Sequence, residues 1–219
     1  MPDFIPPLTE LQAAPVHPGA PLVIVDVDEV IAHFMRGFGV FIGRQGYDFR
    51  VDRFALFQNI YRPGETEPVD MTIGRELFDG FFRDGSGDLE PTAGAADALA
   101  SLSMKAGVLI LTNAPDCGRQ ARAAWLKTHG FDYPLILNSS LKGPAVASLS
   151  GRTTGRAAFI DDLLPNLESV AEHAPAVSRF QMVADERLQP MAPAAPERHT
   201  RHDDWPTLKL AIERAIGNA

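Results

Sequence analysis

The chain has 219 residues, of which 28 are acidic and 20 are basic, and its formal net charge is −8. This length allows one α/β domain with an insertion or two small lobes, and the acidic surface argues against a nucleic-acid polymer or an anionic membrane as the main partner. The single cysteine, Cys117, excludes a disulfide within the chain. The sequence has neither a signal-peptide pattern near its start nor an apolar run of about 20 residues, so we expect a cytoplasmic protein.

Short apolar runs alternate with amphipathic stretches along most of the chain. Four of these runs are continuously apolar, which is typical of strands buried on both faces: Leu22–Asp26, Gly107–Asn113, Pro134–Asn138 and Ala157–Asp162. A fifth run, Val177–Ala184, is more mixed and is expected nearer an edge of the sheet. Because helical patterns lie between the runs, the sequence predicts an α/β fold with a doubly wound parallel sheet.

Three segments depart from this alternation. The proline-rich residues before Leu22 predict an irregular lead-in outside the core, and the segment from Asp185 to Asp204 predicts a long surface loop. From Phe34 to Asp88 the chain is rich in Phe and shows no strong strand. We interpret this segment as a small, mostly helical insertion with its own core, the alternative being one irregular crossover. The predicted division is a core of residues 1–33 and 89–219 and an inserted cap of residues 34–88.

Reactive side chains follow the ends of the predicted strands. The carboxyl ends of parallel strands meet at one edge of a sheet, where ligands bind. Each group alone is weak evidence, because paired Asp residues, a Thr-Asn turn and a single Lys are common without a catalytic role. Their joint placement after successive strands indicates one site, formed by Asp26, Asp28, Thr112, Asn113, Lys142, Asp161 and Asp162.

The carboxylates at this edge favour phosphoryl chemistry assisted by a cation. Asp26 and Asp28 are spaced i and i+2, so one ionised carboxylate can attack phosphorus while the other gives a proton to a leaving alkoxide. Crowding Asp26 with Asp161 and Asp162 is strongly repulsive unless a cation lies among them, and a hard ion such as Mg²⁺ suits oxygen ligands. Two further groups supply positive charge and a hydrogen-bond donor to the transferring oxygens: Lys142 and Thr112.

Four segments carry a resemblance to a known family. In order and spacing, VIVDVDEV, VLILTNAP, LKGPA and FIDDLLPN resemble the four motifs of the haloacid dehalogenase (HAD) superfamily of hydrolases, over nearly all of the chain from Leu22 to about Ala184. The resemblance implies an HAD-like Rossmannoid core. It also implies a C1-type cap after the first strand, where residues 34–88 lie.

The resemblance also implies roles for individual residues. Asp26 would be the nucleophile that forms an aspartyl-phosphate, and Asp28 the general acid and later the base. Retention of Asp28 favours phosphoryl transfer over dehalogenation, which has no leaving alkoxide to protonate. The implied Mg²⁺ ligands are the carboxylates of Asp26, Asp161 and Asp162 and the backbone carbonyl of Asp28. The substrate would contact Thr112, Asn113, Lys142, Glu29 and Phe34.

Glu29 departs from the family pattern, which usually has Gly at this position, and Val30 replaces a frequent Thr. Gly there permits an unusual backbone angle and leaves room beside the phosphate. Two alternatives are open for Glu29. Its side chain points towards the cap and leaves its N–H free to bind phosphate, or its charge projects near the anionic substrate and weakens binding.

The phrase DVDEVIAHF is distantly similar to the start of the 5′(3′)-deoxyribonucleotidases. Phe34, Phe38 and Phe41 would then stack on a base, although at least two of the three are expected to form the cap core. Arg36 and Arg44 are candidates for a second anionic group or for a solvated helix face, and His33 is expected to be a hinge or packing residue.

Three functional hypotheses follow. The first is a Mg²⁺-dependent phosphomonoester hydrolase acting on a small phosphorylated metabolite, with a nucleotide as one candidate. The second is a phosphomutase or phosphotransferase. The third is a non-catalytic phosphate-binding protein in which Glu29 obstructs the site.

Overall fold

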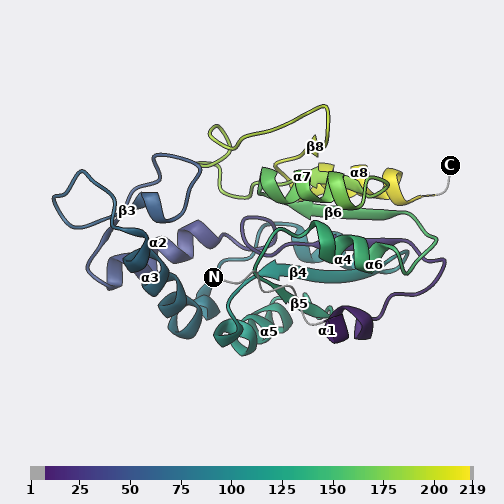
Figure 1. Ribbon diagram of the computed structural model, residues 1–219, viewed down its shortest axis with the longest axis horizontal. Helices are drawn as coiled ribbons and strands as arrows, with labels where there is room; N and C mark the ends of the chain where they lie inside the picture. Colours follow the sequence, from purple (N-terminus) through teal and green to yellow (C-terminus); the bar gives the residue numbers. More distant parts are fainter. Residues whose placement is uncertain (1–7, 218–219) are drawn as a thin grey trace.

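The computed structural model describes residues 8–217 and confirms the predicted α/β sheet (Figure 1). Six parallel strands are arranged in the order β5-β4-β1-β6-β7-β8. The strands are β1 (Leu22–Val25), β4 (Gly107–Asn113), β5 (Leu135–Asn138), β6 (Ala157–Asp161), β7 (Ser178–Gln181) and β8 (Thr200–Arg201). The helices around them are α1 (Leu8–Ala13), α4 (Ala95–Ser103), α5 (Arg119–Thr128), α6 (Gly143–Ser150), α7 (Leu164–His173) and α8 (Trp205–Ile216), with a 3₁₀ turn η3 (Asp116–Gly118).

Helices cover both faces of the sheet because the central strand is apolar on both sides. Along β1, Val23 and Val25 belong to the cluster that includes α4, α5 and α8, whereas Leu22 and Ile24 belong to the cluster that includes α1, α6 and α7. All four side chains are almost completely buried. This two-sided burial explains why the β1 run does not alternate between apolar and polar residues.

The insertion after β1 lies at one end of the molecule, on the left in Figure 1. It contains α2 (Phe34–Arg44), β2 (Asp48–Phe49), η1 (Phe57–Asn59), β3 (Ile60–Tyr61), α3 (Met71–Asp84) and η2 (Ser86–Asp88). The chain enters and leaves it through two paired segments, since His33 N donates to Glu90 O and Thr92 N donates to Ile31 O, both at 2.9 Å. Two core helices hold these segments through indole N–H groups: Trp205 donates to Val30 O and Trp125 to Leu89 O.

Three expectations about segments outside the main strands were wrong in part. The lead-in includes α1, whose Leu11 is buried against the sheet, so it does contribute to the core. The predicted loop before the last helix contains β8, which pairs with β7 and takes the edge position. The insertion, expected to be mostly helical with no strong strand, also includes a short antiparallel pair, β2 and β3. Within residues 8–217, no helix is long and apolar enough to cross a membrane.

A close approach between α6 and α7 generates a stability prediction. A Cβ on Gly143 would lie 2.3 Å from the carbonyl oxygen of Ser169, so Gly143→Ala forces the two helices apart. We expect the free energy of unfolding to fall by about 2 kcal/mol, as in other overpacked cores. Thermal and denaturant unfolding measure this change.

Gly43→Ala in α2 is the matched control. A Cβ on Gly43 meets no atom within 4 Å, and Ala is favoured over Gly in a helix by up to about 1 kcal/mol. Equal stability of Gly143→Ala and the wild-type protein would contradict the close packing of α6 on α7.

Candidate active site

Asp26 follows the last residue of β1 and lies beside the end of β6. The register pairs Val25 with Ile160, so the next residues, Asp26 and Asp161, lie side by side at the carboxyl edge of the sheet. Lys142, which precedes α6, is completely buried between them. Its Nζ lies 2.7 Å from Asp26 Oδ1 and 2.7 Å from Asp161 Oδ2. Burial alone lowers the pKa of Lys142, but the two carboxylates outweigh it and raise that pKa, so the lysine is held as a cation.

Asp26, Asp161 and Asp162 form a buried cluster of three carboxylates that suits a metal ion. One oxygen from each lies within 4.8 Å of the others. Burial raises the pKa of Asp161 to about 6, even though Lys142 lowers it. Burial and the neighbouring Asp161 also raise the pKa of Asp162 well above its ordinary value. The single positive charge of Lys142 therefore does not neutralise the three carboxylates, and a divalent cation would remove the remaining repulsion.

Asn166 orients the Asp161 carboxylate from the first turn of α7. Its Nδ2 donates to both carboxylate oxygens, at 3.0 and 3.2 Å, while Leu163 N donates to Asp161 Oδ1 at 2.9 Å. Asn166 is buried and was not predicted as a site residue. A signal was available, because Asn166 ends the segment FIDDLLPN, which the sequence analysis had already singled out.

Asp28 pairs with Arg122 of α5 and is not part of the cluster formed by Asp26, Asp161 and Asp162. Arg122 NH2 lies 2.7 Å from one Asp28 oxygen and 3.0 Å from the other. Burial raises the pKa of Asp28 to about 6, and Arg122 opposes that rise. Sequence reasoning missed Arg122. Its position three residues before the buried Trp125 marks it as facing the core, and its guanidinium lies over the Phe82 ring.

Glu29 agrees with the first alternative in one respect only: its side chain points towards the insertion, but its N–H is not free. Its φ of 58° lies in the left-handed region, and it is the one residue other than Gly with positive φ among residues 8–217. Its N–H is not free, because it donates to Ala32 O at 2.9 Å. Its carboxylate accepts from Met35 N at 2.7 Å and from Asp185 N at 2.9 Å. Glu29 therefore ties the start of α2 to the segment after β7.

The buried position of Glu29 affects its charge. Burial raises the pKa of Glu29 to about 7, although the two backbone N–H groups favour the ionised form. His33, the residue before α2, makes no side-chain hydrogen bond to the helix end. The Glu29 carboxylate takes over that function for the first turn, where negative charge is favoured.

Thr112 and Asn113 end β4 but point to different surroundings. Thr112 is completely buried, and its Oγ1 has no hydrogen-bond partner in the described part of the chain. Asn113 lines the cavity above the carboxylates. Its Nδ2 donates to Ser140 O at 3.1 Å and its Oδ1 accepts from Asn138 at 2.7 Å. Contact of either residue with a substrate stays a prediction.

A cavity of about 270 Å³ lies between the strand ends and the insertion. Phe34 lines it, as the sequence led us to expect of a substrate-binding residue, whereas Phe38 and Phe41 are packed in the aromatic core of the insertion. Arg36 does not line the cavity, because Glu90 and Glu186 hold it. Arg44 borders a separate hollow. Most of the predicted site residues line the cavity: Asp26, Asp28, Glu29, Phe34, Asn113, Lys142 and Asp162.

Of the comparisons with known proteins, the one with solved structures identifies the fold. No protein-family model and no curated protein matches the sequence. Among solved structures, the HAD-hydrolase YfnB from Bacillus subtilis, bound to magnesium, has a TM-score of 0.61 and 13% identity over 89% of this chain and 99% of its own. A subfamily IA HAD-superfamily hydrolase from Geobacter sulfurreducens has a TM-score of 0.56 and 16% identity over 91% of this chain and 100% of its own. At such identities the likeness shows the fold, which is that of HAD-superfamily hydrolases.

Glu29→Gly tests the contacts of Glu29. The substitution removes two hydrogen bonds to a charged group, worth roughly 1.5 kcal/mol each, and relieves about 1 kcal/mol of left-handed strain. We expect the free energy of unfolding to fall by about 2 kcal/mol and any catalytic rate to fall with it. Thermal unfolding and kcat measure the two effects.

Glu29→Gln is the matched control, because it retains one acceptor oxygen at the same position. Its loss of stability should lie between those of the wild-type protein and Glu29→Gly. A Glu29→Gly protein with a large gain in turnover would show instead that the carboxylate obstructs the cavity.

Proposed function

We propose that this protein is a Mg²⁺-dependent phosphomonoester hydrolase that acts on a small phosphorylated metabolite through an aspartyl-phosphate. The observation that carries the proposal is the cluster of three carboxylates at the base of a cavity, Asp26, Asp161 and Asp162, the first two of which pair with Lys142. The fold shared with HAD-superfamily hydrolases supports it. We further propose that residues 34–88 act as a C1-type cap over this cavity.

The donor set fits a hard divalent cation. Three buried carboxylates offer oxygen ligands within 4.8 Å of one another, and Mg²⁺ prefers oxygen ligands. A bound Mg²⁺ would neutralise these carboxylates and polarise the oxygens of a bound phosphate. The remaining chemistry belongs to side chains of the protein.

Asp26 and Asp28 divide the reaction between them. Lys142 orients the Asp26 carboxylate through Oδ1, and Asp26 attacks phosphorus as the bond to the alcohol oxygen breaks. Asp28, with a pKa of about 6, gives its proton to the departing alkoxide. It then takes a proton from the water that attacks the aspartyl-phosphate, which releases phosphate and restores Asp26.

Asp26→Asn and metal removal test the proposal directly. With Mg²⁺, the wild-type protein should hydrolyse p-nitrophenyl phosphate, and EDTA should abolish this activity. Asp26→Asn should lower kcat by on the order of 10³-fold or more, because an amide is a poor nucleophile. Release of p-nitrophenol and of phosphate provides the measurement.

Asp97→Asn, an exposed change in α4, should retain full activity and serves as the control. Absence of turnover across a panel of phosphomonoesters would contradict a hydrolase. Transfer of the phosphoryl group to an added alcohol instead of water would indicate a phosphotransferase.

Arg122→Gln tests the proton transfer assigned to Asp28. Arg122 lowers the pKa of Asp28, so its removal raises that pKa and keeps the acid protonated to higher pH. We expect the alkaline limb of the kcat/KM profile to move to higher pH. Steady-state kinetics from pH 4 to pH 9 measure the shift.

Two arginine variants serve as controls. Arg122→Lys keeps a positive charge and should shift the limb less. Arg119→Gln removes a more exposed arginine that pairs with Glu10 and Asp116, and it should leave the limb unchanged. An identical limb in Arg122→Gln and the wild-type protein would show that Asp28 is not the group that titrates.

A further inference from the structure

The cavity has a polar base and apolar walls. The polar lining comes mainly from the strand ends and the start of α7, and the proposed function assigns the phosphate and the cation to Asp26, Lys142 and Asp162 of this base. The walls come from the insertion and from the loops after β6 and β7. They consist of Phe34, Met35, Phe54, Ala55, Leu56, Phe78, Leu163 and Leu188.

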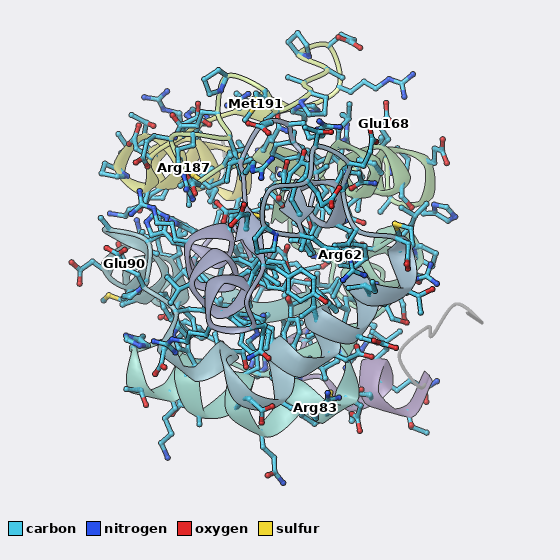
Figure 2. All side chains as sticks on the ribbon, turned by 90° about the vertical axis from the view of Figure 1, so that its left-hand side faces the viewer. Arg62, Arg83, Glu90, Glu168, Arg187 and Met191 are labelled. Atoms are coloured by element: carbon cyan, nitrogen blue, oxygen red, sulfur yellow. The ribbon has the colours of Figure 1, made fainter. Side chains whose placement is uncertain are left out.

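The walls offer no partner for a second charged group. Lys142 is the only basic residue that lines the cavity in the described part of the chain, and two carboxylates occupy it. Arg62 and Arg83 of the insertion do not line the cavity, and Figure 2 shows Arg83 and Glu90 at the margins of the face that the insertion presents. A second phosphate or carboxylate on the substrate would lose its water without gaining a cation.

Several polar groups of the lining make hydrogen bonds within the protein. The Asn113 amide is bonded to Ser140 and Asn138, and the Asn166 amide to Asp161. The Glu29 carboxylate accepts from two backbone N–H groups. Sugar hydroxyls pressed against the apolar walls would find no hydrogen-bond partner there, which selects against a polyol.

The volume limits the size of the alcohol. An apolar cavity of about 150 Å³ holds a benzene ring. The whole cavity here is about 270 Å³, so with phosphate at its base it has room for about one ring. A nucleoside carries both a sugar and a base, and part of it would project out of that space.

We propose that the substrate is the phosphate monoester of a small, uncharged, apolar alcohol about the size of one ring, and that Phe54 is a specificity-determining residue for it. This inference rests on the proposed phosphomonoesterase function. Phe54 is half-buried on the loop between β2 and η1. Phe78, in contrast, packs against Phe57 and Phe82 within the insertion, so its removal would disturb the insertion itself.

Benzyl phosphate and glycerol phosphate are the two probes, because both release an alkoxide of similar basicity and differ in polarity. With Mg²⁺, we expect kcat/KM of the wild-type protein to be about tenfold or more higher for benzyl phosphate than for glycerol phosphate. A factor of this size is what one additional apolar contact in a pocket provides. Phe54→Ala should remove most of this preference by lowering the benzyl value, and Phe54→Leu should retain most of it.

Phe49→Ala is the matched control. It removes a half-buried aromatic ring of β2 that packs against Phe38 and does not line the cavity, so it controls for disturbance of the insertion, and the ratio should stay at the wild-type value. Thermal unfolding checks that each variant is folded. If Phe54→Ala does not fold, the benzyl-to-glycerol ratios of the wild-type protein and of Phe54→Leu test the proposed substrate class instead.

The outcomes separate the two proposals. Turnover with a benzyl-to-glycerol ratio of one or less, or a ratio unchanged in folded Phe54→Ala, overturns the substrate class and leaves the hydrolase function standing. A higher kcat/KM for a sugar bisphosphate or a nucleoside monophosphate than for benzyl phosphate overturns it as well. No turnover of any ester overturns the hydrolase function and the substrate class together.

Discussion

The buried ammonium of Lys142 is the contact on which the rest of the site depends. It lies 2.7 Å from one oxygen of Asp26 and 2.7 Å from one oxygen of Asp161, so a single cation joins the ends of β1 and β6. Burying either carboxylate unpaired would cost several kcal/mol. The parallel register brings the two strands to an end at the same level. Gly143 lets α6 approach α7 closely, and this places Lys142, the residue before α6, between the two carboxylates.

The carboxyl edge of the sheet was predictable because it depends on short-range patterns. Continuous apolar runs mark buried strands, and a parallel sheet brings the residues after them together, so Asp26, Lys142 and Asp161 were expected to meet. The partners that tune these groups come from distant helices. Arg122 and Asp28 are 94 positions apart, and nothing local to either residue identifies the other.

The errors of the sequence analysis share a physical cause. Both β8 and β3 have only two residues, too few for an apolar pattern, and their pairing depends on a neighbouring strand that is already in place. The Pro-rich lead-in gave no sign of α1, because Leu11 is the one buried side chain among those described in that short helix, and its other contacts come from the distant Arg119 and Arg152. The contacts that fix the Glu29 side chain were not predictable for a related reason, since its two hydrogen-bond partners lie 6 and 156 positions away.

The two halves of the cavity come from different parts of the chain. The polar base depends mainly on the core sheet, and most of the apolar wall depends on the insertion, so the chemistry and the choice of alcohol have separate structural origins. Glu29 links these parts, because its backbone follows Asp28 while its side chain holds the first turn of α2 and the segment after β7. Gly at this position would permit the same backbone angle without that link. The left-handed strain at Glu29 is therefore offset by two hydrogen bonds that hold the walls in place over the base.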